Sequence, residues 1–292
     1  MLTSGVPSTI GIQAQPLFTL NLRGTVWASY RPVIMGILNV TPDSFSDGGN
    51  FTSLSAALRQ IEKLIQEGAD IIDIGGASSR PSADIVPVEE EWKRLEPAIS
   101  HAIKEFPSIP ISIDTWRAEV ARRALDLGIH MINDISAGTL EPEIIFHTAK
   151  AKAPLIIMHM QGTPLTMQVK PEYGEVIVEI VEYLTQRINE VRKQGILDII
   201  IDPGFGFGKT MEHTLSLIHN LKLICSLGVP VLTGFSRKSF LSKITGASAL
   251  NTEPLHAILN YQALQAGVLF LRVHDVASAH QALAWYLKSN TK

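Results

Sequence analysis

The chain has 292 residues, of which 46% are hydrophobic, and it carries a formal net charge of −3 at pH 7. The slightly acidic charge balance argues against a nucleic-acid groove. The sequence contains no uninterrupted apolar run of about 18 residues, so it predicts no membrane span. The single cysteine excludes a disulfide within one chain, and the N-terminus lacks a secretory pattern, so we expect a cytoplasmic protein.

The first elements are an arm and a hairpin. Residues 1–16 predict a flexible N-terminal arm, and residues 17–31 predict a β-hairpin. Residues 17–292 show no linker or composition break, so they predict one domain. After the hairpin, short apolar runs alternate with longer amphipathic stretches, and continuous apolarity is typical of parallel strands buried on both faces. The eight runs are residues 32–40, 69–75, 109–114, 130–134, 153–160, 197–202, 229–234 and 268–275.

The stretches between the runs predict helices. Residues 53–68 begin with Ser53, which can cap a helix, and they end at a glycine. Residues 88–106 carry acidic side chains in the first turn, where the helix dipole favours negative charge. Residues 175–195 also end at a glycine, and Cys225 falls in a further predicted helix.

Eight strand–helix units in succession predict a (β/α)8 TIM barrel. The alternative is an open, doubly wound sheet. Eight regular units without a linker favour the closed barrel, with the N-terminal β-hairpin covering its bottom. In such a barrel the carboxyl ends of all strands meet at one end, here called the mouth, where active sites are built.

Polar side chains end seven of the eight runs. Buried carboxylates are costly unless they meet hydrogen-bond donors, so a ring of them predicts a ligand rich in N–H groups, or a metal. Asp134 points away from Asn133 on a strand, so we interpret it as a helix cap. The strand-end residues are Asn39, Asp73, Asp114, Asn133, Asp134, His159, Asp202, Arg272 and His274.

Several longer motifs follow the runs in order and with barrel spacing. Together they closely resemble the dihydropteroate synthase family over roughly residues 32–280. The motifs are NVTPDSFSDGG (39–49), DIGGASSRP (73–81), SIDT (112–115), INDI (132–135), HMQG (159–162), DPGFGFGK (202–209), SRKS (236–239) and RVHDV (272–276).

The resemblance implies a barrel that joins hydroxymethylpterin pyrophosphate to p-aminobenzoate with Mg²⁺, releasing pyrophosphate on the way to folate. Sulfonamides compete with p-aminobenzoate in that family. The family also commonly forms homodimers through outer helices, here residues 252–266 and 276–288.

A pterin site is expected from three strand ends. The Asp202 carboxylate can accept two parallel N–H bonds from the 2-amino and ring N–H edge of a pterin. Asp114 and Asn133, from neighbouring strands, can complete this recognition. The resemblance assigns all three to the pterin pocket and adds, at matching positions, Met158, Gly234 and Lys238.

A p-aminobenzoate site is expected beside Lys238, whose ammonium can face both substrates. The glycine-rich DPGFGFGK stretch fits neither a Walker loop nor a Rossmann fingerprint, because Pro203 and Lys209 stand where those motifs need glycine. It more simply lets the backbone approach a flat ring, with Phe207 as an aromatic wall. Loops 41–50 and 76–86 would close over the reacting centre. The implied contacts are Phe45, Ser79, Arg80, Pro81, Phe207, Lys238 and Ser239, while Arg237 is interpreted as structural.

A diphosphate site is expected from Arg272 and His274. The two residues stand two apart and so face the same way on a strand, and a guanidinium beside an imidazole suits an anion. Asn39 on the adjacent strand can join them or hold Mg²⁺ that bridges the diphosphate. The predicted catalytic set is Asn39, Asp114, Asp202, Lys238, Arg272 and His274.

Two stretches depart from the family pattern. Ala77 and Ser79 stand where the family has a glutamate and a threonine, and Trp116–Arg117–Ala118 replaces Ser-Lys-Pro. These changes keep two alternatives open. One is a pterin-binding barrel that transfers methyl groups from methyl-tetrahydrofolate to a corrinoid, although it would not need Arg272 with His274. The other is a non-catalytic paralogue.

Overall fold

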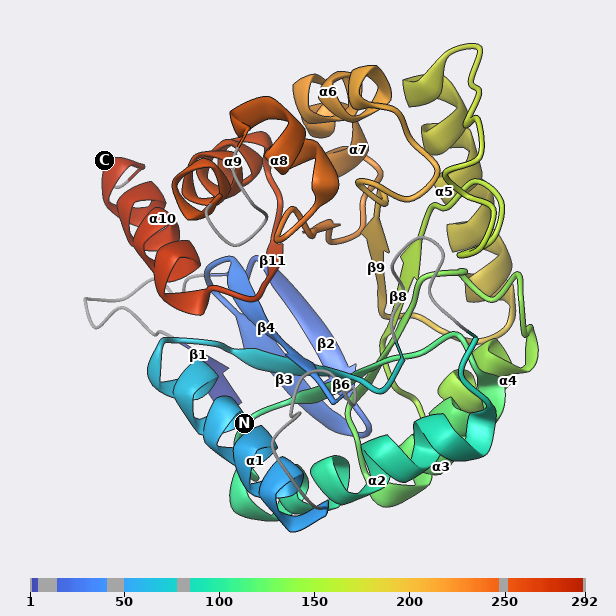
Figure 1. Cartoon of the computed structure of the whole chain (residues 1–292), viewed down its shortest axis with the longest axis vertical. Helices are drawn as coiled ribbons and strands as arrows, with labels where there is room; N and C mark the ends of the chain where they lie inside the picture. The colour runs from blue at the N-terminus through green and yellow to red at the C-terminus, as the bar shows by residue number, and fades with distance from the viewer. Residues whose placement is uncertain (1, 5–14, 41–49, 78–84, 247–251, 291–292) are drawn as a thin grey trace.

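The computed structural model describes residues 2–4, 15–40, 50–77, 85–246 and 252–290. Eight parallel strands form a ring surrounded by helices (Figure 1). The sheet order is β10-β11-β4-β5-β6-β7-β8-β9, and a parallel bridge between Ile201 and Val231 joins its two ends. The predicted (β/α)8 barrel is therefore confirmed. Its strands are β4 (Val33–Asn39), β5 (Ile71–Gly75), β6 (Ile111–Asp114), β7 (Met131–Asp134), β8 (Leu155–Met158), β9 (Ile199–Asp202), β10 (Leu232–Thr233) and β11 (Phe270–Val273).

The helices whose bounds the sequence predicted, α1, α2, α5, α9 and α10, begin and end within three residues of those bounds, and Cys225 lies in a helix, α7, as expected. One detail was wrong. Helix α1 begins at Asn50, one turn before Ser53, so Ser53 lies inside the helix and cannot cap it. None of the helices described is long and apolar enough to cross a membrane. The helices are α1 (Asn50–Gln66), α2 (Val88–Glu105), α3 (Ala118–Leu127), α4 (Glu143–Lys150), α5 (Val176–Lys193), α6 (Met211–His219), α7 (Leu221–Cys225), α8 (Ser239–Thr245), α9 (Glu253–Ala266) and α10 (Val276–Ser289).

The predicted hairpin consists of β2 (Phe18–Leu22) and β3 (Thr25–Ser29), which pair antiparallel. Its two-residue turn has φ of +53° at Arg23 and +99° at Gly24, the pair of positive values that a tight hairpin turn requires. A further strand, β1 (Leu2–Ser4), pairs parallel with β3. It falls in the segment expected to be a flexible arm, of which residues 5–14 lie outside the description.

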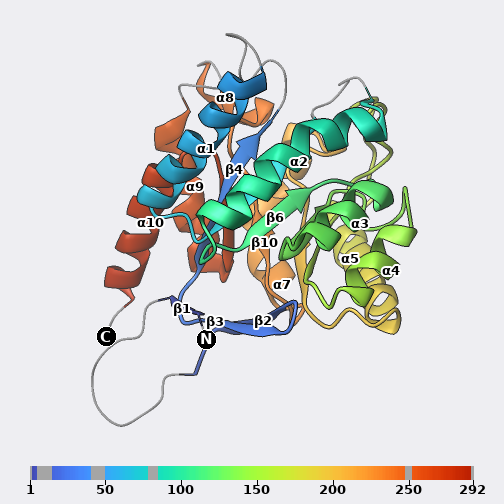
Figure 2. The same cartoon turned by 90° about the horizontal axis from the view of Figure 1, so that it is seen from below.

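The hairpin closes the bottom of the barrel (Figure 2). Its buried side chains Phe18, Leu20, Leu22 and Trp27 form one apolar cluster with inward-facing side chains at the start of the barrel strands. This apolar cluster is here called the floor of the barrel. Polar groups can therefore gather at the opposite end, the mouth. The barrel side chains in the cluster are Val33, Met35, Ile71, Met131, Ile156, Ile200, Leu232 and Phe270.

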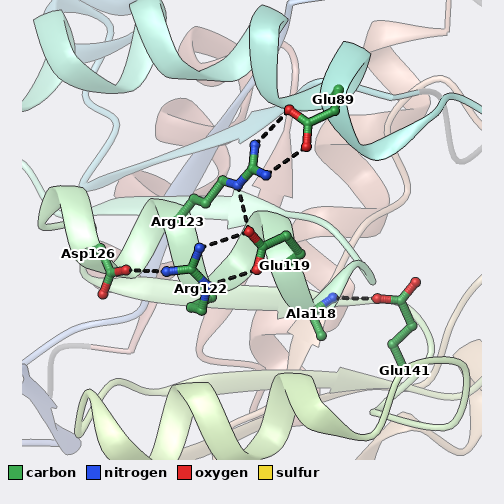
Figure 3. A network of polar contacts seen from close by, with 7 residues as sticks. All are labelled: Glu89, Ala118, Glu119, Arg122, Arg123, Asp126 and Glu141. Carbon is green, nitrogen blue, oxygen red and sulfur yellow. Dashed lines mark hydrogen bonds and ion pairs between the residues drawn. The ribbon is translucent and has the colours of Figure 1, made fainter.

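On the outside of the barrel, Arg123 joins α3 to α2, and its neighbour Arg122 pairs within α3 (Figure 3). Arg123 lies 2.6 Å from Glu89 and 2.7 Å from Glu119. Arg122 lies 2.7 Å from both Glu119 and Asp126. Such partly exposed ion pairs each contribute only about 0–1 kcal/mol. Burial of the apolar helix faces against the outward side of the strands therefore does more to hold the helical layer in place.

Candidate active site

The polar strand ends point into the barrel because side chains alternate along a strand. Each of these polar strand-end side chains lies an even number of residues after a floor side chain on the same strand, or next to side chains that face the helices. Either position places it on the inward face of its strand. The pairing register also sets Asn39, Gly75, Asp114 and Asn133 level with one another across four adjacent strands. The side chains brought to the mouth in this way are Asn39, Asp73, Asp114, Asn133, Met158, Asp202 and Arg272.

Arg272 joins two carboxylates at the centre of this ring. Its Nε donates to Asp73 Oδ2 and its Nη2 donates to Asp114 Oδ2, both at 2.6 Å. Asn133 Nδ2 donates to the same Asp73 oxygen at 3.0 Å. Burial raises the pKa of Asp114 to about 6, although the charge of Arg272 opposes that shift. Arg272 is thus held by carboxylates, and an anion at the mouth would share it with them.

Asp73 is a site residue that sequence reasoning did not assign. It is fully buried, and its Oδ1 has no hydrogen-bond partner among the residues described. The sequence signals were its position near a strand end and its place at the start of the DIGGASSRP motif. Its partner Arg272 lies 199 positions away, so the pairing depends on closure of the barrel.

His274 and Asn39 lie side by side at the junction of β11 and β4, as predicted. Asn39 Nδ2 is 3.5 Å from His274 Nε2. Ser236 Oγ is 3.0 Å from His274 Nδ1 and accepts the His274 backbone N–H at 3.2 Å. The imidazole is therefore oriented from both sides, which leaves its ring edge near the Asn39 amide.

Asp202 ends β9, level with Met158 on β8. Its Oδ1 accepts the backbone N–H of Gly204 at 2.7 Å. Burial raises the pKa of this carboxyl, while the Gly204 N–H and the positive charges of Lys238 and Arg272 favour its ionised form. A buried carboxylate facing the mouth is suited to accept N–H groups from a flat heterocycle.

Lys238 and Phe207 form the next wall of the mouth. The Lys238 ammonium lies 3.9 Å from the centre of the Phe207 ring, a cation–π contact. Phe207 packs with Ile135, Met158 and Met167, and Trp116 adds to this apolar group. Phe207 thus lies beside Lys238, and its role as an aromatic wall for substrate stays a prediction.

Other predicted contacts lie near this wall or outside the description. Gly234 has room beside Arg272, since a Cβ there would lie 3.8 Å from the Arg272 carbonyl oxygen. Ser239 is the first residue of α8, and its side chain is not described. Arg237 is exposed with φ of +57°, and its backbone N–H donates to His256, in keeping with a structural role. Phe45, Ser79, Arg80 and Pro81 lie outside the described residues.

A cavity of about 260 Å³ adjoins the mouth at Asp114. Ala77 and Trp116, two of the departures from the family pattern, both line it. Glu91, which sequence reasoning missed, also lines it and accepts the Thr115 hydroxyl at 2.7 Å. Burial raises the pKa of Glu91 to about 7. The cavity is further lined by Ile85, Val86, Arg117, Ile135, Leu140, Thr163, Pro164 and Leu165.

The interpretation of Asp134 as a helix cap was wrong. Its carboxylate faces away from the mouth and accepts the backbone N–H groups of Ser136 and Gly138 and the Ser136 hydroxyl. It therefore shapes the turn after β7, because the next helix, α4, begins only at Glu143.

The donors at the mouth fit a divalent cation only if substrate helps to hold it. In the described part of the chain, no three or more His, Cys, Asp or Glu side chains form a metal cluster. Asn39 offers one amide oxygen beside His274. Mg²⁺ commonly keeps several waters and binds through one or two protein oxygens plus substrate phosphates. The residues present therefore fit an ion shared with a diphosphate.

A family profile described as "Pterin binding enzyme" matches residues 35–274. The chain belongs to the pterin-binding enzyme family. Within this family, it is 46% identical over 258 residues to a dihydropteroate synthase of Synechocystis, covering 86% of this chain and 88% of that protein. It is 40% identical over 265 residues to dihydropteroate synthase of Escherichia coli, covering 89% of this chain and 93% of that protein.

Solved structures in the family share the same architecture. A dihydropteroate synthase of Xanthomonas albilineans with 4-aminobenzoic acid has a TM-score of 0.87 and 40% identity, over 94% of this chain and 99% of that one. The same enzyme in complex with 7,8-dihydropteroate has a TM-score of 0.83 and 38% identity, over 94% and 100% of the two chains. The pterin-binding barrel is therefore common to this chain and those enzymes.

Proposed function

We propose that the chain catalyses the dihydropteroate synthase reaction, the condensation of 6-hydroxymethyl-7,8-dihydropterin pyrophosphate with p-aminobenzoate to give 7,8-dihydropteroate and pyrophosphate. The observation that carries this proposal is the mouth itself. Buried Asp202 and Asn133 and partly buried Asp114 surround one side, and Lys238 stacked on Phe207 forms another, in a chain 40% identical to an enzyme whose structure contains 4-aminobenzoic acid.

Substrate positioning follows from these groups. The Asp202 carboxylate accepts the 2-amino and ring N–H groups of the pterin, with Asp114 and Asn133 beside it. The aryl ring of p-aminobenzoate lies along Phe207, next to the Lys238 ammonium. Holding the amine near the pterin methylene carbon in this way removes much of the entropic barrier.

The bond changes are those of a substitution at carbon. The C–O bond from the pterin methylene to the diphosphate breaks, and the oxygen keeps the electron pair. The resulting pterin cation is stabilised by the nearby carboxylates. The arylamine nitrogen forms the new C–N bond and then loses a proton to water. Since a neutral arylamine is already nucleophilic, no strong general base is needed.

His274 and Asn39 would receive the leaving diphosphate, together with Arg272. Bound Mg²⁺, held by Asn39 and the diphosphate oxygens, would supply charge neutralisation for the leaving group. This part of the proposal rests on the position of the Asn39 amide beside His274 and on the family resemblance.

A pyrophosphate-release assay tests the function. With both substrates and Mg²⁺ we expect one pyrophosphate per dihydropteroate, and no release when p-aminobenzoate is omitted. A methyltransferase would release none, and a non-catalytic paralogue would bind the pterin pyrophosphate in calorimetry without releasing any. Absence of release at saturating substrates would therefore reject the synthase assignment.

Sulfonamides should inhibit by competing with p-aminobenzoate, because one similar structure, from Yersinia pestis, is described as a sulfonamide complex. We also propose a homodimer, on the basis of the family resemblance, and a cytoplasmic location, on the basis of the single cysteine. Light scattering after gel filtration would then give about twice the 31.9 kDa mass of one chain. A mass of one chain at micromolar concentration would contradict the dimer.

A further inference from the structure

We infer that Lys209, buried behind the mouth, is a positioning residue that ties the loops after β8 and β9 together and so fixes Phe207 as the wall for p-aminobenzoate. This inference rests on the proposed function. Lys209 touches neither substrate in this arrangement, and it acts through the backbone of the residues it binds.

The Lys209 ammonium has a full set of neutral acceptors. Its Nζ lies 2.9 Å from His159 Nδ1, 2.9 Å from the Phe207 carbonyl oxygen and 3.3 Å from the His159 carbonyl oxygen. The residue is only 4% exposed. An ammonium has three N–H donors, so each donor has one acceptor, and two of the acceptors are backbone atoms of different loops.

His159 is the matching half of this contact. Burial, and then the charge of Lys209, lowers the pKa of His159 to about 2, so its imidazole is neutral. Because Lys209 donates to Nδ1, the ring proton stands on Nε2. The ring centres of Tyr183 and Tyr173 lie 4.9 and 6.0 Å from that of His159, which holds the imidazole in place.

The two loops approach closely at the same point. Gly204 has φ of +72°, and a Cβ there would lie 2.0 Å from the His159 carbonyl oxygen. Gly208 has φ of +63°, and its Cβ would lie 2.7 Å from the Gln161 carbonyl oxygen. The glycines permit this approach, and the Lys209 ammonium donates to the approached His159 carbonyl oxygen and to the Phe207 carbonyl oxygen.

Loss of this ammonium should affect the two substrates unequally. The Phe207 carbonyl is bound directly by Lys209, whereas Asp202 has its own bond from the Gly204 backbone. Displacing Phe207 therefore alters the p-aminobenzoate side of the mouth more than the pterin side.

The test is Lys209→Met, which keeps a long apolar side chain and removes the donors. We expect the KM for p-aminobenzoate to rise at least tenfold, and the Kd of the pterin pyrophosphate, measured by calorimetry without p-aminobenzoate, to change less than threefold. Lys150→Met, at an exposed position on α4, is the matched control and should change neither value. Unchanged or equally changed constants in Lys209→Met would overturn the inference.

A second pair of variants covers poor folding of Lys209→Met. His159→Asn keeps an acceptor near the Nδ1 position, and His159→Leu removes it. We expect a raised KM for p-aminobenzoate in His159→Leu and a smaller change in His159→Asn. Equal constants in the two variants would overturn the inference. An inactive wild type would instead reject the proposed function.

The pH dependence gives a further readout. Burial lowers the pKa of Lys209 to about 7. The titratable groups that face Lys209 are His159, Asp202 and Lys238, and Tyr173 and Tyr183 lie around the His159 imidazole. The neutral amine has two N–H donors for three acceptors. Between pH 6.5 and 8.5 the KM for p-aminobenzoate should therefore rise more in the wild type than in Lys209→Met. Parallel profiles would contradict a role for the ammonium.

Discussion

At the residue scale, the mouth is defined by how its charges are paired. Arg272 stands between Asp73 and Asp114, so its removal would leave buried Asp73 and partly buried Asp114 without the guanidinium that both carboxylates share. Breaking a buried ion pair in this way commonly costs about 3–5 kcal/mol. Substitution of Arg272 would therefore mix a loss of stability with any loss of diphosphate binding, and it is a poor probe of the predicted anion site.

Asp202 is a cleaner probe of pterin binding. Asp202→Ala removes a desolvated carboxylate, and relief of that desolvation offsets the loss of the Gly204 bond and of the attraction to Lys238 and Arg272, so the free energy of unfolding should change by less than about 1 kcal/mol. Two charge-assisted hydrogen bonds to the pterin are lost, which should weaken binding by at least about 100-fold. Calorimetry with the pterin pyrophosphate and urea unfolding measure the two effects. Loss of folding with the substitution would favour a structural role instead.

Glu91 should make stability depend on pH. Burial raises the pKa of Glu91 in the folded state from 4.5 to about 7. Between these two pH values the folded state binds more protons than the unfolded chain, so the contribution of Glu91 to stability falls as pH rises through 7. Glu91→Gln removes this loss and keeps an acceptor for Thr115. The variant should gain about 2 kcal/mol over the wild type between pH 5 and pH 8 in urea unfolding.

The control for this experiment is Glu96→Gln, at an exposed position on the same helix. Its stability difference from the wild type should not change with pH. A Glu91→Gln difference that is equally flat would show that the buried carboxyl titrates normally.

At the element scale, the loop after β9 should tolerate substitution of Gly204 less well than substitution of Gly206. Gly204→Ala would place Cβ 2.0 Å from the His159 carbonyl oxygen at a positive φ, so we expect destabilisation by about 3 kcal/mol or more. Gly206→Ala is the matched control, because its φ is +76° but its nearest contact is Lys238 Cδ at 3.4 Å. It should cost only about 1–2 kcal/mol of backbone strain. Similar unfolding midpoints for the two variants would contradict this close approach.

The strands and main helices were predictable because their signals are local. The barrel strands lie inside the predicted apolar runs, and α2, α5, α9 and α10 end within two residues of the predicted boundaries. Strand β1 was not predicted, since three residues with no periodic pattern carry no such signal. The start of α1 was misplaced for a related reason, because a serine that can cap a helix can also lie inside one.

At the scale of the whole molecule, the barrel separates stability from function between its two ends. Trp27 of the hairpin is 3% exposed and packs edge-to-face on Phe18 in the floor cluster. Trp27→Ala should destabilise the protein by about 3–5 kcal/mol through the cavity it leaves. Both KM values should stay unchanged at a temperature where the variant is folded, because the floor lies opposite the mouth.

Val26→Ala is the matched control for the floor, because Val26 is 56% exposed on the same strand. It should change the free energy of unfolding by less than about 0.5 kcal/mol. Thermal unfolding and steady-state kinetics on both variants check the separation. A change of either KM in Trp27→Ala would mean that the floor and the mouth are coupled.

The sequence by itself determined the barrel, the inward direction of Asp114, Asn133 and Asp202, and the aromatic position of Phe207. The barrel and the strand-end directions follow from periodicity and from polar residues at strand ends, which are local properties of the chain, and the Phe207 position follows from the glycine-rich motif that contains it and from the family resemblance. Only the tertiary structure decided that Arg272 is held by Asp73 and Asp114, that Glu91 is buried, and that Lys209 binds two loops. Each of these depends on which distant strands become neighbours and on how much water the closed barrel excludes, and neither quantity is encoded in any short stretch of sequence.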